Sequence, residues 1–309
     1  MINRPRPVKP RPLDGVRLAV LVNPSAGSRQ GMLRAARAVA VLQEAGALTT
    51  VLSAAEASTL AAMADDAASS ADALVAVGGD GMVQAGAEAA LRSGLPLGII
   101  PAGTGNDAAR ALGVPRRGDA AVHRFVAAWD SGGRAVDVAR VDLPDGAVRH
   151  YVTALAAGFD AVVNRQANEW TRPRGTLRYV AAIFRRIGGF RPVHYRLRVD
   201  GVTEETDAVI LTVANGSSFG GGLRIAPRAV PDDGMLDLVT VAPISRLLLV
   251  LIFPLAFLGL HVLHPAVTVR RVREVRLESG GPVCHADGEA LTAPPLSVTV
   301  LPGALRVLV

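Results

Sequence analysis

The side chains best suited to catalysis or ligand binding gather in glycine-rich segments, and the first of these surrounds Asp80. An apolar run at residues 74–77 leads into Gly78-Gly79-Asp80-Gly81, and an alanine-rich stretch with helical periodicity follows. A strand that ends in glycine lets the backbone approach a ligand, and the free amides at the start of the next helix attract anions. The segment therefore predicts a phosphate-binding loop, for which a strand-to-helix turn without any ligand is the alternative.

A second glycine-rich segment, Pro101-Ala-Gly-Thr-Gly-Asn-Asp107, follows a predicted strand at residues 97–100. It carries hydrogen-bonding side chains at Thr104, Asn106 and Asp107. Because parallel α/β sheets bind ligands at the carboxyl ends of their strands, we expect these groups to lie beside Asp80. The segment also matches the GxGxxA dinucleotide fingerprint, but the acidic residue that this fingerprint requires is missing. A role for Asn106 as a helix N-cap alone is the alternative.

Carboxylates are concentrated in two later segments. In Cys284-His-Ala-Asp-Gly-Glu289, the two acidic side chains would face the same side if the segment were extended. Such a pair could supply a general base, whereas a hairpin turn with two solvated acids is the alternative. The other segment contains Asp232, Asp233 and Asp237, which could hold a divalent ion together with backbone carbonyls, or could simply form an Asp-Gly turn.

The basic composition limits the kinds of kinase and partner that are compatible with this chain. Its 309 residues carry a formal net charge of +6, yet Lys9 is the only lysine. A P-loop and a protein kinase each need a lysine on the phosphates, and Lys9 lies in a proline-rich tail, so both classes are excluded. Backbone amides, hydroxyls and arginines must then hold any bound phosphate. Aromatic residues make up 4% of the chain and offer few stacking platforms, so we expect no nucleic-acid partner.

The N-terminal tail and the single cysteine bear on where the protein works. Residues 1–12 are basic and rich in proline, which predicts a disordered tail, and they contain no apolar core of a secretory signal. A chain with one cysteine, Cys284, can form no internal disulfide, which favours a reducing compartment. We therefore expect a cytoplasmic protein, whose basic surface suits anionic lipid headgroups or phosphate ligands.

Hydrophobic patterning divides the rest of the chain into two domains. Over residues 13–133, apolar runs alternate with helical stretches, which predicts a doubly wound α/β domain around a parallel sheet. Over residues 134–309, closely spaced β-branched segments and tight turns predict an antiparallel β-sandwich, with a helical insert at about residues 176–187. The last strands, within residues 295–309, could complete the sandwich or return to the first domain.

Residues 246–263 form an unusually apolar segment. No charged residue follows Arg246 within it, although Pro254 and Gly259 interrupt it. Its length lies at the lower limit for a transmembrane helix. Three interpretations stay open: a buried helix, a helix that spans a membrane, and a helix that docks on a membrane beside a lipid site.

In their order along the chain, these motifs resemble the diacylglycerol kinase catalytic-domain family, which includes bacterial lipid kinases and the sphingosine and ceramide kinases. The resemblance covers nearly everything after residue 16. It rests on Asn23-Pro-Ser-Ala-Gly27, Gly78-Gly-Asp-Gly81, Pro101-Ala-Gly-Thr-Gly-Asn-Asp107, Gly158-Phe-Asp160, Asn215-Gly216, Gly220-Gly-Gly222, Asp233-Gly234 and Asp287-Gly-Glu289. It implies a nucleotide-binding α/β domain like that of NAD kinases, a β-sandwich domain, and an ATP site between them.

The resemblance also assigns roles to residues. The family's proton acceptor falls on Glu289, with Asp287 as neighbour or alternative, while Asp80 suits the magnesium ion of the nucleotide or the base itself. A magnesium site of the family falls on the carboxylate of Asp233 and the carbonyls of Val230 and Met235. Its nucleotide contacts fall on Asn23, Ser53, Gly78, Gly79, Asp80, Gly81, Met82, Val83, Gln84, Thr104 and Asn106.

The implied reaction is phosphorylation, by ATP with magnesium, of the primary hydroxyl of diacylglycerol or a related lipid to phosphatidic acid or its equivalent. The resemblance further implies a peripheral enzyme at the anionic inner face of the membrane, and a homodimer in some members. The chain departs from the family at Met82, Gln84 and Ala85, where threonine, asparagine and glutamate are usual. Loss of a hydroxyl bonded to a phosphate weakens binding by about 1.5–3 kcal/mol. An NAD kinase, and a binding protein that has lost catalysis, are the alternatives.

Overall fold

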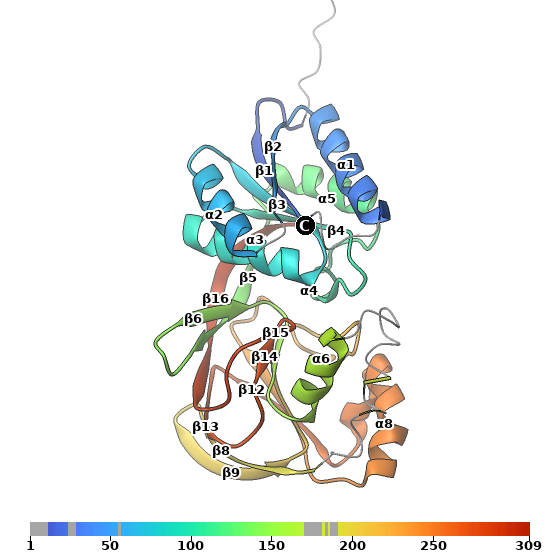
Figure 1. Ribbon diagram of the computed structural model, residues 1–309, viewed down its shortest axis with the longest axis vertical. Helices are drawn as coiled ribbons and strands as arrows, with labels where there is room; N and C mark the ends of the chain where they lie inside the picture. The colour runs from blue at the N-terminus through green and yellow to red at the C-terminus, as the bar shows by residue number, and fades with distance from the viewer. Residues whose placement is uncertain (1–11, 24–28, 55–56, 170–180, 183–184, 186–190) are drawn as a thin grey trace, which may run out of the picture.

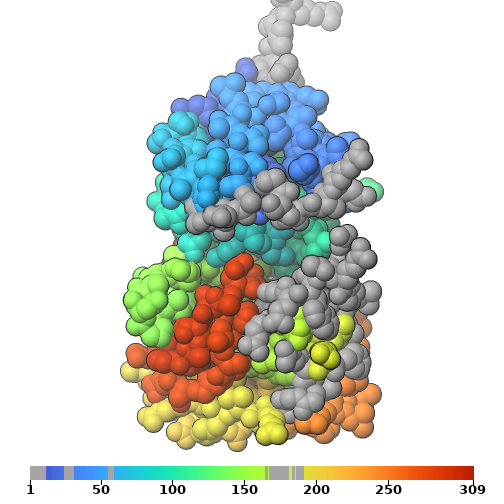
Figure 2. Space-filling model, in the orientation of Figure 1, coloured from blue at the N-terminus to red at the C-terminus, as the bar shows by residue number. Residues whose placement is uncertain are grey.

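The computed structural model describes residues 12–23, 29–54, 57–169, 181–182, 185 and 191–309. The predicted tail, except for residue 12, lies outside the described residues. So do residues 24–28 and most of the helical insert predicted at residues 176–187. The described chain forms two domains, one above the other in Figure 1 and in the space-filling view of Figure 2. The long strand β16 (Leu296–Leu308) joins them.

The first domain is a parallel sheet between two layers of helices. The strands are β1 (Arg17–Val22), β2 (Leu48–Ser53), β3 (Ala73–Gly78) and β4 (Leu97–Pro101), in the order β2-β1-β3-β4. The helices are α1 (Arg29–Glu44), α2 (Ala57–Ala68), α3 (Asp80–Ser93), α4 (Asp107–Ala111) and α5 (Gly118–Trp129). Residues 73–77 are fully buried, as expected of a parallel strand covered on both faces.

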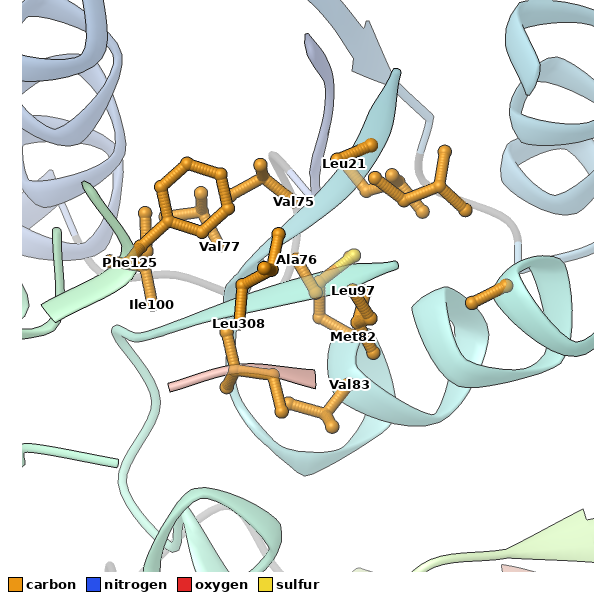
Figure 3. Close-up of a cluster of buried hydrophobic side chains, with 14 of the residues drawn as sticks. Leu21, Val75, Ala76, Val77, Met82, Val83, Leu97, Ile100, Phe125 and Leu308 are labelled. Carbon is orange, nitrogen blue, oxygen red and sulfur yellow. The ribbon is translucent and has the colours of Figure 1, made fainter. Parts of the chain in front are cut away.

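The two faces of β4 show how the helices cover the sheet. Neighbouring strand residues point to opposite faces. A Cβ atom at Gly98 would overlap the ring of Phe125 from α5, whereas Leu97 packs against Gly86 of α3. Helices α5 and α3 therefore lie on opposite faces, α5 beside α1 and α3 beside α2 (Figure 1). Figure 3 shows the core between them, with Phe125 on one side of the strands and Met82 on the other.

The second domain is a β-sandwich. Its strands are β5 (Arg134–Asp142), β6 (Val148–Tyr151), β7 (Ala154–Ala156), β8 (Val193–Val199), β9 (Val202–Ala208), β10 (Ile210–Ala214), β11 (Leu236–Val241), β12 (Val267–Val272), β13 (Glu274–Ser279), β14 (His285–Ala286), β15 (Glu289–Ala290) and most of β16. Alternate residues from two sheets meet in its core, among them Leu197, Leu277, Leu211 and Leu238. The helices α6 (Phe159–Glu169) and α8 (Arg246–Leu258) and the 3₁₀ helix η2 (Leu260–Leu263) pack outside the six-stranded sheet, on the lower right in Figure 1.

Strand β16 returns to the first domain, which settles the alternative left open by the sequence. Its residues Ser297–Thr299 pair with β13 and β5, and its residues Val307 and Leu308 pair in parallel with Leu97 and Gly98 of β4. In the described part of the chain, the parallel sheet and one layer of the sandwich are thus one ten-stranded sheet. Backbone hydrogen bonds hold the two domains together.

The apolar segment at residues 246–263 folds as α8 followed by η2. Ser245 caps α8 by accepting a hydrogen bond from the amide of Leu248, and Gly259 ends it in the left-handed conformation. Among the residues that the structure describes, no helix is both long and apolar enough to cross a membrane.

Candidate active site

The carboxyl ends of the four parallel strands bring most of the predicted nucleotide residues to one edge of the sheet. Val22 pairs with Ser53 on one side and with Val77 on the other, and Gly78 pairs with Pro101. The segments that follow these positions carry Asn23, Gly79, Asp80, Gly81 and Thr104. This edge is where open parallel α/β sheets bind their ligands.

The two glycine-rich loops pack directly against each other. The amides of Ala102 and Gly103 donate to the carbonyl of Gly78, at 2.8 and 3.2 Å. A Cβ atom at Gly103 would collide with the Cα atom of Gly79, and one at Gly105 would lie 2.6 Å from Oδ2 of Asp80. Contact between the two loops, rather than a ligand, therefore requires glycine at positions 103 and 105.

Gly81 differs from the other loop glycines. A Cβ atom added there would meet nothing within 4 Å, and the residue is exposed in the first turn of α3. No packing within the described chain therefore explains a glycine at this position. The amide dipoles at this end of α3 favour an anion, so the open space beside Gly81 is suited to a phosphate.

Asn106 closes the second loop. It has a φ of 53°, its Oδ1 accepts from the amide of Gly103 at 3.1 Å, and its Nδ2 donates to the carbonyl of Gly103 at 2.9 Å. The side chain makes no cap hydrogen bond to α4, so it shapes the loop instead. Thr104, at the tip of that loop, is exposed.

Asp80 lies between the loops, in a position that alters its acidity. Its Oδ1 accepts from the amide of Ala108 at 3.0 Å. Burial raises the pKa of Asp80 to about 6, and the nearby carboxylates of Asp107 and Asp287 act in the same direction. A carboxylate with a pKa near neutrality is better able to accept a proton than an ordinary aspartate is.

Asp287 lies in a hairpin turn, which is one of the two alternatives that the sequence left open for this segment. Strands β14 and β15 pair Ala286 with Glu289, and Asp287 and Gly288 form the turn with φ values of 45° and 91°. The Asp287 carboxylate accepts from the amides of Val152, Thr153 and Ala154, at 2.7, 2.9 and 3.3 Å, and from the hydroxyl of Thr153. Residues 152 and 153 therefore leave the strand pairing and separate β6 from β7.

These contacts give Asp287 a structural role. Burial raises the pKa of Asp287, although its hydrogen bonds with Thr153 and the neighbouring amides oppose that effect. Both carboxylate oxygens already accept hydrogen bonds. Glu289, in contrast, is exposed on β15.

Asp107 and Arg110 join the site to the second domain, and only the first of them was singled out from the sequence. Asp107 is buried and forms an ion pair with Arg110, while its Oδ2 accepts from the amide of Gly221 at 2.6 Å. Arg110 also donates to the carbonyl of Gly105 at 3.1 Å, and its guanidinium lies over Gly222. The spacing of Arg110 one helical turn after Asp107 is the feature that could have predicted this pair.

The departures from the family pattern have a structural basis. Met82 is buried in the core of the first domain and lies close to Gly78. Figure 3 shows its side chain near Ala76 and Leu97. The amides of Met82 and Val83 donate to the carbonyl of Gly79, and both side chains face the core. Neither residue offers a nucleotide a free amide or a polar side chain.

Gln84 serves the domain interface. Its Nε2 donates to the carbonyl of His150 on β6, while Glu88, one turn further along α3, binds the amide and ring of the same histidine at 3.1 and 3.0 Å. Ala85 is half-buried and offers no polar side chain. The side chains of this stretch thus stabilise the contact between α3 and the sandwich.

Of the residues to which the resemblance assigns magnesium, Asp233 forms an ion pair with Arg271. The carboxylate of Asp233 also accepts from the amide of Met235 at 3.1 Å, and Val230 is exposed. An arginine already neutralises this carboxylate, so the residues present do not fit a cation site in this arrangement. Within the described ranges, no group of three or more His, Cys, Asp or Glu side chains could hold a metal.

An apolar pocket in the second domain lies between α6, α8, η2 and the six-stranded sheet. Its polar members are Asp160, whose pKa burial raises to about 6, and His261, whose pKa burial lowers. The Nε2 of His261 donates to the carbonyl of Ile225 at 3.0 Å, whereas its Nδ1 is buried and has no partner among the described residues. The other described lining residues are apolar and include Phe159, Val163, Phe219, Gly220, Leu249, Ile252, Phe253, Ala256 and Phe257.

The loop of residues 219–222 connects this pocket to the carboxyl edge of the parallel sheet. Phe219 and Gly220 line the pocket, and the next residue, Gly221, donates its amide to Asp107. Asp107 in turn lies close enough to Asp80 to raise its pKa. A single loop thus borders the pocket at Gly220 and contacts the second glycine-rich segment at Gly221.

Taken together, the parallel sheet, the sandwich and the loop edge define a two-domain protein with an NAD-kinase-like fold. Residues 17–141 match the diacylglycerol kinase catalytic domain, and residues 153–309 match the YegS C-terminal NAD kinase beta sandwich-like domain. The chain belongs to the diacylglycerol kinase catalytic-domain family, which is a family of lipid kinases.

Individual relatives agree with this membership. A diacylglycerol kinase of Mycobacterium tuberculosis (strain H37Rv) is 37% identical over 239 residues, which cover 77% of this chain and 76% of that protein. A probable lipid kinase YegS-like of Stenotrophomonas maltophilia is 30% identical over 244 residues, 76% of this chain and 78% of its own length. The crystal structure of a diacylglycerol kinase from Bacillus anthracis superposes with a TM-score of 0.67 at 20% identity, covering 95% of this chain and 96% of that one, which shows the shared fold.

Proposed function

We propose that the protein is an ATP- and magnesium-dependent lipid kinase that phosphorylates the primary hydroxyl of diacylglycerol or a closely related lipid. The observation that carries this proposal is the continuity of two sites. Gly220 lines the apolar pocket, and the adjacent Gly221 donates to Asp107, which lies next to Asp80 in the phosphate-binding loops. A lipid with its chain in the pocket would bring its hydroxyl toward the bound nucleotide.

ATP would bind at the carboxyl edge of the parallel sheet. Its phosphates would lie over the open space at Gly81, near the hydroxyl of Thr104, where amides at the start of α3 favour negative charge. Since the described residues supply no three-ligand cluster, magnesium would arrive bound to the phosphates as part of the substrate. Asp80 is the neighbouring carboxylate that could complete its coordination or act as the base.

Asp80 is the better candidate for the proton acceptor. It is half-buried at the site, where desolvation raises its pKa to about 6, whereas Asp287 uses both oxygens to hold residues 152–154, and Glu289 is exposed. In the step, the lipid oxygen attacks the γ-phosphorus as its proton passes to Asp80. The bond between that phosphorus and the bridging oxygen breaks, releasing ADP and a phosphorylated lipid.

The apolar pocket and the basic composition suggest where the enzyme works. A lipid substrate resides in a membrane, and the net charge of +6 favours an anionic one. We place the enzyme at the cytoplasmic face of such a membrane, without spanning it.

A substrate panel tests the function. The purified protein is incubated with labelled ATP, magnesium and, in separate reactions, diacylglycerol, monoacylglycerol, sphingosine, ceramide and NAD. The proposal predicts transfer to diacylglycerol or another hydroxylated lipid, and none to NAD. Formation of NADP without lipid phosphate would make the protein an NAD kinase, and ATP binding without any transfer would make it a binding protein.

A further inference from the structure

The outer face of α8 and η2 is a row of exposed leucines. Leu247, Leu251, Leu255 and Leu258 recur at helical spacing on one side of α8, and Leu260 and Leu263 continue the row into η2. Their exposed fractions lie between 41% and 75%. Besides these leucines, the only exposed residue from 247 to 263 is Pro254, so every exposed residue of this segment is apolar. We call these six leucines the leucine row.

The opposite face of the same helix forms a wall of the apolar pocket. Leu249, Ile252, Phe253, Ala256 and Phe257 line that pocket from α8, and His261 lines it from η2. Helix α8 is therefore apolar on both faces, with solvent on one side and the pocket on the other. A soluble helix normally exposes a polar face, so the outer leucines are not explained by folding alone.

Basic residues flank one end of the leucine row. Arg224 and Arg228 are both exposed, in a loop that packs against the end of α8. The amide of Arg224 donates to the carbonyl of Ala256 at 3.0 Å, and a Cβ atom at Gly259 would contact Pro227. An apolar face with arginines at its rim matches the apolar interior and anionic headgroups of a bilayer surface.

We propose that the leucine row inserts into the surface of an anionic lipid bilayer and holds α8 in the plane of the membrane. This inference rests on the proposed function, since it places the pocket of a lipid kinase directly behind the surface that meets its substrate. The 13 residues of α8 span roughly 20 Å at 1.5 Å per residue, which suits a helix lying on a bilayer rather than crossing it. Arg224 and Arg228 bind the headgroups beside it.

The composition of the face favours a bilayer over a second copy of the chain. Interfaces between proteins carry aromatic side chains at their centre and a rim of hydrogen-bonding groups. The leucine row has leucine alone, and Arg224 and Arg228 lie beside the end of α8. A bilayer requires no complementary shape and accepts such a face.

Vesicle binding by the full-length protein tests the proposal. Leu247, Leu251 and Leu258 are replaced together by serine, and binding to vesicles of phosphatidylcholine mixed with phosphatidylglycerol is measured by co-sedimentation. We expect the affinity to fall by at least roughly tenfold, because three leucines no longer leave water. The matched control replaces Leu33 and Leu48, which are equally exposed in the first domain, and leaves binding unchanged. Replacing Arg224 and Arg228 by glutamine should weaken binding to the anionic vesicles and not to pure phosphatidylcholine.

Three results would overturn the proposal: no vesicle binding by the unaltered protein, undiminished binding by the triple variant, or a dimer that the triple variant dissociates. The last result would show that a second copy covers the row. Phosphorylation of water-soluble dihexanoylglycerol, measured in the same variants, should stay within about twofold, because that substrate needs no membrane. Vesicle binding through the leucines without any lipid phosphorylation would support docking while refuting the proposed function, so the two failures are distinguishable.

Discussion

Gly81 and Gly103 both belong to the glycine-rich segments, but they meet different surroundings. A Cβ atom at Gly81 meets open space, whereas one at Gly103 collides with the backbone of Gly79. The identity of a glycine in the sequence cannot distinguish these two cases. Their contrast gives a way to separate nucleotide binding from folding.

We expect Gly81→Ala to raise the KM for ATP by roughly tenfold or more while leaving thermal stability equal or slightly higher. A methyl group there would occupy the proposed phosphate space without touching the protein, and alanine is the better helix former. Steady-state kinetics and calorimetric unfolding provide the two readouts. Gly103→Ala is the comparison and should lower the melting temperature. An unchanged KM for ATP in Gly81→Ala would place the phosphates elsewhere.

The raised pKa of Asp80 predicts a particular pH dependence. As a base, Asp80 is active when deprotonated, so kcat/KM for the lipid should fall about tenfold per pH unit below pH 6 and level off above it. Burial raises this pKa, so the decline begins well above the range of an ordinary aspartate. A pH profile of kcat/KM on a soluble short-chain lipid measures it. Glu289→Gln should show the same decline of kcat/KM below pH 6. If this variant lacks the decline, Glu289 is the base and Asp80 is not.

Among the elements, the hairpin of β14 and β15 shows where sequence patterns were insufficient. The acids around Gly288 were compatible with an extended segment and with a hairpin turn, and the positive φ of Asp287 shows that the chain turns there. Asp287 then accepts hydrogen bonds from residues far away in sequence, at positions 152–154. Such a contact follows from tertiary packing and could not be derived from local spacing.

Replacing Asp287 by alanine should lower the free energy of unfolding by about 3 kcal/mol or more, since it leaves several amides without an acceptor at about 1–3 kcal/mol each. Denaturant unfolding measures this loss. Glu289→Gln, two residues away and exposed, serves as the control and should change stability by less than about 0.5 kcal/mol. Equal stability of the two variants would contradict the structural part given to Asp287.

Elements with strong periodicity were predicted well. The alternation of apolar runs and helical stretches over residues 13–133 indicated a parallel sheet covered by helices, and the runs at residues 74–77 and 97–100 correspond to β3 and β4. Helix α6 was missed, because the pattern of the second domain indicated helices only at about residues 176–187 and in the apolar segment. In α6, the segment beginning at Phe159 is short and follows a glycine, so its helical form depends on packing against β10.

For the whole molecule, the sequence predicted an α/β domain followed by a β-sandwich, and the structure confirms that fold class. The continuity of the sheet through β16 was left open, since a strand of 13 residues can pair with β13 at one end and β4 at the other. The connection between pocket and phosphate loops was not foreseen either. It depends on Gly221 and Asp107, which are distant in sequence and meet only across the domain interface.

The central claim is that the pocket and the phosphate loops form a single site for lipid phosphorylation. Kinetics of Ala256→Phe with dioleoylglycerol and with dihexanoylglycerol test it most directly, because Ala256 lines the pocket on α8. A phenylalanine there should fill the pocket and lower kcat/KM for the long-chain lipid by at least about tenfold. The short-chain lipid and the KM for ATP should change by no more than about twofold. Equal kcat/KM for the long-chain lipid in the variant and the unaltered protein would contradict the account.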